Sequence, residues 1–399
     1  MNLHSGTPFW LVQNGLMPTR PVLSADEQCD VAIIGAGITG ALIADAMTTA
    51  GIDVIVLDRR ESGVGSTAAS TALLQYEIDV ELIELSTRRG DDVARRAYLA
   101  SARAVTDILS RASQLGACDS VSRSSLYLAS TRRDGRRLQR EADRRAAIGL
   151  PAEWWSRDEV VSRYGFPCHG AIRSTLAGEI DALAFTRQLL ASAEASGARW
   201  YEQTEATDYR VSAPGVTLTT ARGHLVHART IVCATGYALP AFLRHDRVAL
   251  HSTYALATER VESFGEWNDQ SLVWESARPY CYMRTTRDSR VIIGGEDVPF
   301  KDAGWRDRLI PSKTRKLEER LRTLLPSIHT ETAYEWAGTF AETPDGLPYI
   351  GTMPEYPGVQ FALGYGGNGI TFSGIAARVL TGEVLGESAE DADLYGFER

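Results

Sequence analysis

A glycine-rich turn between two short apolar runs is the part of the sequence whose chemistry is easiest to read. The turn reads Gly35-Ala36-Gly37-Ile38-Thr39-Gly40. Gly35 permits a tight turn, Gly37 lets the backbone approach a pyrophosphate, and Gly40 lets the following helix pack close to the strand. Asp58 ends the second apolar run, where it can accept hydrogen bonds from ribose hydroxyls. The pattern predicts a dinucleotide-binding unit over residues 30–58, and NAD and FAD both fit it.

Three later segments could also follow an extended ligand. Small and hydroxyl-bearing residues run from Gly65 to Leu73, so the backbone there can lie close to a ligand and bond to it. A buried strand ends in Ala234-Thr235-Gly236. A third segment, Gly364 to Ile370, opens a helix that runs to Leu380, and a helix start favours an anionic group.

In this order, the segments resemble the FAD-dependent D-amino-acid oxidase superfamily, which includes glycine oxidase, sarcosine oxidase and γ-glutamylputrescine oxidase. The resemblance covers nearly the whole chain and includes the stretch from Gly338 to Gly351. It implies an α/β (α+β mixed) fold with a Rossmann-like FAD-binding domain, and oxidation of a C–N bond in an amino acid or amine. With the turn residues, the FAD contacts we expect are Gly35, Gly37, Ile38, Thr39, Gly40, Asp58, Arg59, Ser66, Thr67, Thr71, Ala72, Leu73, Ala206, Ala234, Thr235, Gly236, Gly338, Gly367, Asn368, Gly369 and Ile370.

The family often binds FAD covalently through a cysteine, and the matching position here is Gly338, five residues before Thr343. We therefore expect noncovalent FAD. The five cysteines are widely scattered without a C-x-x-C spacing, which indicates reduced thiols, and the histidines form no metal-ligand pattern.

The family holds its substrate between the flavin and an antiparallel sheet, and the matching stretch is 278–285. Strand alternation puts Tyr280, Tyr282 and Arg284 on one face and Cys281 and Met283 on the other. Two phenols and a guanidinium suit the orientation of a carboxylate-bearing amine, because arginine binds carboxylates in a bidentate manner.

Other roles for these and neighbouring residues stay open in the sequence. Arg284 can instead pair with an internal acid, such as Glu275 or Asp297. Tyr254, Trp336 and His251 are further candidates near the substrate, although such residues are more often structural. A base is not required, since a neutral amine can transfer a hydride from its α-carbon to flavin N5 and leave an imine that hydrolyses.

Alternating nucleotide-type and antiparallel pieces predict two interleaved domains. The FAD-binding domain would comprise residues 1–120, 181–245 and 331–399, and the substrate-binding domain 121–180 and 246–330. We expect a mostly irregular lead-in over 1–28 and helices over 80–115, 132–147, 185–196 and 313–325, the second of them a solvated, charged helix.

Bulk properties narrow the class of protein. A net charge of −9 argues against a nucleic-acid partner. An apolar run of about 20 residues and a signal-peptide pattern are both missing, which predicts a cytoplasmic protein without a membrane span. The expected partners are an amine or amino-acid substrate and oxygen or another electron acceptor.

Two alternatives share the glycine-rich turn. A flavin-dependent monooxygenase usually has a Gly-Asp flavin motif where this chain has Gly367-Asn368-Gly369. A non-catalytic FAD-binding subunit is the other. The sequence leaves the substrate, the oligomeric state and the choice between oxidase and dehydrogenase open.

Overall fold

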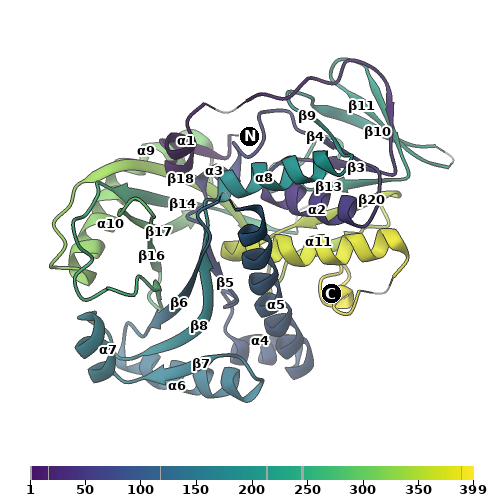
Figure 1. Cartoon of the computed structure of the whole chain (residues 1–399). Helices are drawn as coiled ribbons and strands as arrows, with labels where there is room; N and C mark the ends of the chain where they lie inside the picture. Colours follow the sequence, from purple (N-terminus) through teal and green to yellow (C-terminus); the bar gives the residue numbers. More distant parts are fainter. Residues whose placement is uncertain (1, 17, 117, 213, 244–246, 388) are drawn as a thin grey trace.

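Three β-sheets and the helices around them form the fold in the described part of the chain (Figure 1). The structure is a computed structural model that describes residues 2–16, 18–116, 118–212, 214–243, 247–387 and 389–399. Helices α2, α8 and α11 lie side by side next to the smaller sheets (Figure 1). The largest sheet lies on the other side of α5 from these sheets (Figure 1).

A six-stranded sheet contains the glycine-rich turn. Its order is β19 (Tyr349–Thr352), β20 (Val359–Leu363), β13 (Thr230–Cys233), β3 (Val31–Ile34), β4 (Val54–Leu57) and β9 (Arg199–Tyr201). All neighbours are parallel except β19 and β20. Every residue of β3 is buried, as expected for a parallel strand covered on both faces. The predicted strand–turn–helix–strand unit is confirmed, with α2 (Ile38–Thr49) as its helix.

The ten-stranded sheet is mostly antiparallel and contains the predicted tyrosine strand, β16. Its order is β1 (His4–Gly6), β18 (Thr332–Glu342), β14 (Ala249–Thr258), β17 (Val291–Pro299), β16 (Cys281–Thr285), β15 (Leu272–Glu275), β6 (Val121–Leu128), β8 (Ala171–Glu179) and β5 (Leu73–Gln75), with β7 (Ala152–Trp155) paired to β8. The third sheet has the order β10 (Ala206–Ser212), β11 (Gly215–Thr220), β12 (Leu225–Ala228) and β2 (Glu27–Gln28).

The expected helices are present, the one over 132–147 with the expected bounds and the others with shifted ends. They are α4 (Leu82–Arg89), α5 (Asp91–Leu115), α6 (Arg132–Ala147), α8 (Ala182–Ala195), α10 (Ile310–Leu324) and α11 (Gly369–Leu385). Shorter helices are α1 (Phe9–Asn14), α3 (Ser66–Ala69), α7 (Arg157–Tyr164) and α9 (Ala303–Arg308), with 3₁₀ turns η1 (Gly366–Asn368) and η2 (Ala392–Leu394).

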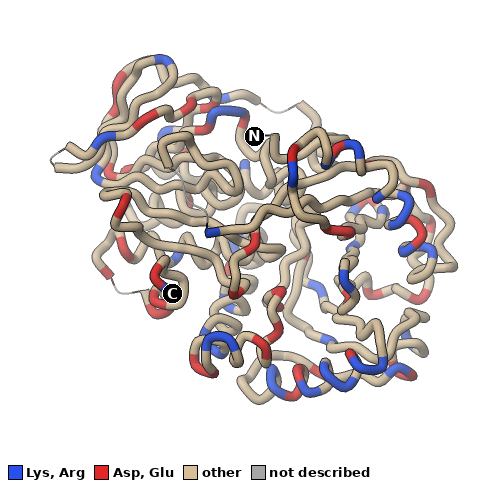
Figure 2. Tube along the Cα trace, turned by 180° about the vertical axis from the view of Figure 1, so that it is seen from behind, with Lys and Arg blue, Asp and Glu red and all other residues tan. Residues whose placement is uncertain are grey.

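Helix α6 is less solvated than expected. Basic and acidic residues alternate along it at the lower edge of the molecule, and charges of both signs are spread over the rest of the surface (Figure 2). Glu141 and Arg145 are nevertheless fully buried. They form an ion pair with a 2.7 Å separation between Arg145 Nε and Glu141 Oε1. The inner face of α6 is therefore part of the packing.

The N-terminal lead-in is more ordered than expected, and the sheets divide the chain at other points than the predicted domains. Strand β1 pairs with β18, and α1 packs against α3 and α8. Strands β1, β5 and β18 belong to the ten-stranded sheet, whereas the predicted domain bounds assign their residues to the FAD-binding domain. The largest apolar cluster contains residues of both sheets, such as Ile33 of β3 and Ala255 of β14. The two halves thus share one core.

Candidate cofactor and substrate site

A cavity lies between the six-stranded and the ten-stranded sheet. The glycine-rich turn lines it from one sheet, and β16 lines it from the other. The predicted residues among its lining are Gly35, Gly37, Ile38, Thr39, Asp58, Ser66, Thr67, Thr71, Ala72, Leu73, Ala234, Thr235, Gly236, Tyr280, Tyr282, Gly338, Gly367, Asn368, Gly369 and Ile370. Segments from across the sequence therefore meet at one site.

The glycine-rich turn is shaped by close backbone approaches. Gly35 has a φ of 111°, and a Cβ there would collide with the carbonyl oxygen of Ala234 at the end of β13. A Cβ at Gly40 would collide with the carbonyl oxygen of Gly35. Gly40 therefore lies outside the described lining and acts by bringing α2 against the turn.

Side chains next to the turn hold its N–H groups and leave polar atoms for a ligand. Asp58 accepts hydrogen bonds from the backbone N–H groups of Ala36 and Arg60, both at 2.8 Å. Burial raises the pKa of the Asp58 carboxyl. Thr67 Oγ1 accepts one from Ile38 N at 3.0 Å. Ser66 Oγ is buried at the lining and has no partner among the described residues, so a bound group can satisfy it.

The opposite end of the cavity is the start of α11. Gly367 N donates to Asp79 Oδ2 at 2.9 Å, and Asn368 Nδ2 donates to the Glu77 carbonyl oxygen at 2.7 Å. These two donors are engaged within the chain, and the positive end of the α11 dipole favours negative charge at this place. An FAD pyrophosphate near the turn and a flavin near the start of α11 fit this arrangement.

Arg59 and Ala206 lie away from this cavity. A small second hollow is lined by Leu23, Arg59, Gln203, Thr204, Glu205, Thr220, Ala221 and Arg222. Ala206 is buried at the start of β10, directly after Glu205. Contacts of Arg59 and Ala206 with FAD stay a prediction.

The predicted tyrosine face is present. The rings of Tyr280 and Tyr282 lie 5.7 Å apart and line the cavity, while Cys281 and Met283 are buried in the core behind the strand. Gly294 on β17 makes room for the Tyr282 ring, because a Cβ there would lie 2.6 Å from that ring. Burial raises the pKa of both phenols, so they are neutral hydrogen-bonding groups.

Arg284 does not reach the cavity, and the expectation that it orients the substrate does not fit its contacts. Its side chain is 2% exposed. Arg284 Nη1 donates to the carbonyl oxygens of Ala72 and Ile180, each at 2.9 Å, and Nε lies 3.4 Å from Glu179 Oε2. Glu179 is thus the internal acid, in place of Glu275 or Asp297. Alternation gave the correct face of the strand, but Arg284 lies beyond the point where that face meets the cavity.

Tyr254, Trp336 and His251 also lie outside the described lining. Tyr254 Oη donates to the Arg306 carbonyl oxygen at 3.3 Å, and Trp336 Nε1 donates to the Ala69 carbonyl oxygen at 2.9 Å. His251 Nε2 lies 3.4 Å from Glu342 Oε2. These contacts fit a structural role for all three residues.

Several lining residues were not found from the sequence. They are Leu3, Arg60, Gly63, Gln75, Glu77, Asp79, Tyr237, Thr253, Trp274, Thr339 and Phe340. Gln75, Glu77 and Asp79 directly follow the predicted segment 65–73, so extending that segment would have included them. Trp274 is paired with Tyr282 across the sheet, a neighbour that the sequence alone does not reveal.

A family model for FAD dependent oxidoreductases matches residues 30–382. The chain belongs to the FAD dependent oxidoreductase family. Its cofactor is therefore FAD. All five cysteines are described, and they are buried and outside the described lining, which agrees with noncovalent FAD. Among the described residues, there is no group of potential metal ligands, and no helix has the length and hydropathy to cross a membrane.

Curated oxidases and oxidoreductases match this chain along most of its length. Glycine oxidase of Geobacillus kaustophilus (strain HTA426) is 27% identical over 380 residues, 92% of this chain and 96% of that protein. Gamma-glutamylputrescine oxidoreductase of Escherichia coli (strain K12) is 26% identical over 396 residues, 94% of this chain and 87% of that protein.

Solved structures with a similar fold include an oxidase and a dehydrogenase. The crystal structure of glycine oxidase from Geobacillus kaustophilus has a TM-score of 0.77 at 24% identity, covering 91% of this chain and 96% of that chain. L-proline dehydrogenase from P.horikoshii has a TM-score of 0.78 at 18% identity, covering 93% and 97%. The expected fold class, a Rossmann-like FAD-binding unit joined to an antiparallel sheet, is confirmed.

Proposed function

We propose that this FAD dependent oxidoreductase oxidises the C–N bond of an amine or amino acid. The observation that supports this best is the presence of Tyr280 and Tyr282 in the same cavity as the two segments that suit FAD, the glycine-rich turn and the start of α11. Bound FAD would accept a hydride from the substrate's α-carbon. The resulting imine then hydrolyses in water.

The chain's own contribution is orientation and shielding. Tyr280 and Tyr282 supply an aromatic wall, and Thr253 Oγ1 lies 3.5 Å from Tyr282 Oη at the same lining. Burial keeps both phenols protonated, so they can donate hydrogen bonds but do not act as bases near neutral pH. Among the described lining residues there is no histidine or lysine. These features fit a substrate that enters as a neutral amine.

The curated relatives support this class of reaction. The names of the two curated relatives given above refer to amino-group substrates, glycine and gamma-glutamylputrescine. Their identity to this chain is below 30%, so the names support C–N oxidation in general and leave the substrate to experiment.

The test is anaerobic reduction of the purified yellow holoprotein. We expect at least one compound from a panel of amines and D- and L-amino acids to bleach the flavin absorbance, because hydride transfer reduces the ring. Air is then admitted, and rapid recovery of the colour indicates that oxygen is the acceptor. If no compound of the panel bleaches the flavin, the proposal is wrong. Substrate-dependent NAD(P)H consumption would instead support a monooxygenase.

A further inference from the structure

The segment 77–83 carries contacts that hold the start of α11 at the cavity. Asp79 Oδ2 accepts a hydrogen bond from Gly367 N at 2.9 Å, and the carbonyl oxygen of Glu77 accepts one from Asn368 Nδ2 at 2.7 Å. The flavin of FAD fits this end of the cavity, where the α11 dipole favours negative charge. The position of segment 77–83 therefore affects where the start of α11 lies relative to the flavin.

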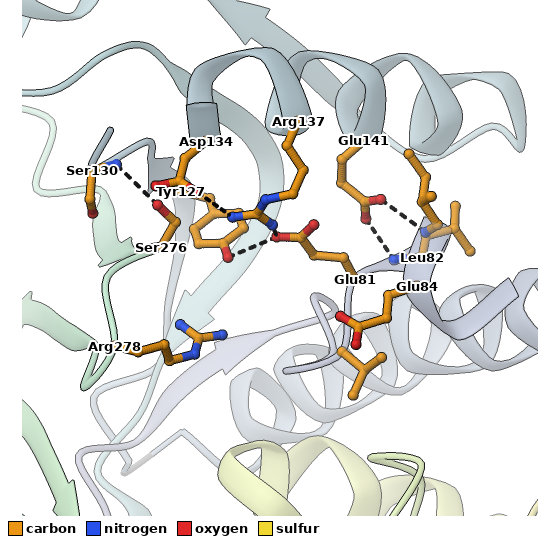
Figure 3. A network of polar contacts seen from close by, with 12 residues as sticks. Glu81, Leu82, Glu84, Tyr127, Ser130, Asp134, Arg137, Glu141, Ser276 and Arg278 are labelled. Atoms are coloured by element: carbon orange, nitrogen blue, oxygen red, sulfur yellow. Dashed lines mark hydrogen bonds and ion pairs between the residues drawn. The ribbon is translucent and has the colours of Figure 1, made fainter. Parts of the chain in front are cut away.

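Side chains of α6 hold the C-terminal part of this segment. Glu141 accepts hydrogen bonds from the backbone N–H groups of Leu82 and Ile83 at 2.7 and 3.0 Å (Figure 3). Arg137 pairs with the carboxylate of Glu81 (Figure 3). Helix α6 contributes no residue to the described lining of the cavity, yet it is joined to a segment that reaches this lining.

Arg145 of α6 brings a buried positive charge to the beginning of the segment. Its side chain is 0% exposed, and its Nε donates to Glu141 Oε1 at 2.7 Å. Burial raises the pKa of the Glu77 carboxyl, and the charge of Arg145 is the strongest influence that lowers it. Burial and the charge of Glu77 raise the pKa of the Tyr76 phenol, and Arg145 lowers it. Arg145, Glu77 and Tyr76 thus lie close together, and we call them the buried polar site.

Four polar atoms of the buried polar site have no hydrogen-bond partner within the described part of the chain. They are Tyr76 Oη, Glu77 Oε2, and Nη1 and Nη2 of Arg145. The other carboxylate oxygen, Glu77 Oε1, accepts from Ser125 Oγ at 2.6 Å. Because the four atoms lack partners, they do not bond to one another, and buried charges without hydrogen bonds are costly. Water molecules inside proteins occupy such places, where each makes about three hydrogen bonds to buried polar groups.

We propose that one or more internal water molecules join Arg145 to Glu77 and Tyr76, and that Arg145 thereby positions the segment that holds the start of α11 beside the flavin. The water donates to Glu77 Oε2 and accepts from an Nη group of Arg145, so that the two opposite charges are linked without direct contact. Arg145 is then a positioning residue of the cofactor site. This inference goes beyond the proposed C–N oxidation, because it concerns the cofactor and holds for any substrate.

A crystal structure of the holoprotein, at a resolution that shows bound water, tests the water site. We expect an ordered water molecule within hydrogen-bonding distance of both Glu77 Oε2 and an Nη atom of Arg145. A direct ion pair between these two side chains, or an empty space between them, would show that the proposed water site is wrong.

Arg145→Met tests the positioning role, with Arg144→Met as the matched control. Arg144 is the neighbouring residue on α6 and pairs with Asp91 at the surface at 2.8 Å, so both variants lose one arginine from the same helix. We expect Arg145→Met to make hydrogen exchange about tenfold faster at the backbone amide of Gly367, because segment 77–83 is held less firmly. Mass spectrometry of the peptides that contain Gly367 measures this exchange in the apoprotein and the holoprotein, and Arg144→Met should leave it unchanged.

The midpoint potential of the flavin is a second measurement, which a loss of overall stability alone does not shift. A less firmly held start of α11 stabilises the negative charge of the reduced flavin less well. We expect Arg145→Met to shift the equilibrium about tenfold toward oxidised flavin, which lowers the potential of this two-electron couple by about 30 mV. Arg145→Lys keeps a charge and a donor for the water, so it should restore most of this loss. Reduction with dithionite against a reference dye measures the potential without any substrate.

The outcomes decide the positioning role independently of the proposed function. Unchanged exchange at Gly367 and an unchanged flavin potential in folded Arg145→Met would overturn it, and so would equal effects of Arg144→Met. If Arg145→Met does not fold, Tyr76→Phe decides, because it removes one partner of the water and leaves the buried charges in place. We expect Tyr76→Phe to change both measurements in the same direction by a smaller factor, and no change would overturn the role. A flavin that no amine reduces would refute C–N oxidation and leave this inference standing.

Discussion

Arg284 is a buried cation that joins three parts of the chain. It binds the carbonyl oxygen of Ala72 in the segment 65–73 and that of Ile180 just before α8, and it pairs with Glu179 of β8. A buried charge is tolerated only where it is paired and hydrogen-bonded, and removing one partner leaves the other uncompensated. Arg284 therefore has a structural role: it holds the end of the tyrosine strand against the segments that carry Ala72 and Ile180.

We expect Arg284→Ala to lower the free energy of unfolding by about 3 kcal/mol, because it leaves the carbonyl groups of Ala72 and Ile180 without their donor and removes one of the two cations that pair with the buried Glu179, the other being Arg123. Arg287→Ala is the control, since Arg287 is exposed just beyond the same strand and pairs with Asp119 on the surface. Urea unfolding of the holoprotein measures both. Native-like stability with a raised KM for carboxylate substrates would instead favour a role in substrate binding.

Asp297 should make the stability depend on pH. Burial, with the nearby charges of Asp79 and Glu342, raises the pKa of its carboxyl to about 7. The unfolded chain loses this proton near pH 4, so the folded state binds more protons between about pH 4 and 7. The free energy of unfolding contributed by this group therefore falls as the pH rises through that window.

We accordingly expect Asp297→Asn to unfold at higher urea concentration than the native protein at about pH 8, and the difference to shrink toward about pH 4. Asp107→Asn, on the exposed side of α5, is the charge-matched control and should show no such trend. Equal shifts of Asp297→Asn at both pH values would contradict the argument.

At the scale of elements, the site depends on how closely α2 and α11 approach the turn and each other. Thr39 Oγ1 and Ser373 Oγ are 2.8 Å apart and join the two helices near their N-terminal ends. Gly40 is the position where α2 touches the backbone of the turn. The start of both helices is thereby held at the cavity.

We expect Gly40→Ala to lose FAD and to unfold at lower temperature, because its Cβ would displace the carbonyl group of Gly35. Gly382→Ala in α11 is the matched control, since the nearest contact of its Cβ would be 3.6 Å from Ala389 Cβ. The control should be neutral or more stable by up to about 1 kcal/mol, because alanine favours the helix. FAD content and thermal unfolding report the result. A Gly40→Ala protein with full FAD would contradict this packing argument.

The sequence predicted correctly those elements whose pattern lies within one short stretch of the chain. The unit from β3 to β4, helix α11 and the alternation of Tyr280 and Tyr282 are of this kind. Pairing between distant strands has no local signal, which is why β1 beside β18 was not expected. Strand alternation does not show how far along a strand the cavity extends, which is why Arg284 was predicted to lie with the tyrosines. Glu77 and Asp79 follow the predicted segment 65–73 and carry no local signal that they line the cavity.

At the scale of the molecule, the cavity joins two sheets that otherwise meet through a shared apolar core. A ligand that contacts both sheets binds only the assembled fold, so it stabilises the whole chain by mass action. FAD, the cofactor of this family, is such a ligand.

We therefore expect FAD to raise the thermal unfolding temperature of the apoprotein, and the rise should grow with the FAD concentration. At an FAD concentration 100 times the dissociation constant, the free energy of unfolding should increase by about 2.7 kcal/mol. Because Gly338 stands where a covalent family member has cysteine, acid precipitation should release all the flavin into the supernatant. Flavin retained on the denatured chain would contradict noncovalent binding, and AMP alone serves as the control ligand for nonspecific stabilisation.

Strand β1 has a consequence for how the protein is made. His4 is paired with Gly338, so the beginning of the chain must wait for β18 before it has a partner. The cavity likewise needs both Gly35 and Ile370, residues that leave the ribosome at very different times. Contacts between such distant segments slow folding. During synthesis, the apolar strand β3 and its glycine-rich turn are exposed without their cofactor for most of translation, and this interval is when chaperones are most useful to the chain.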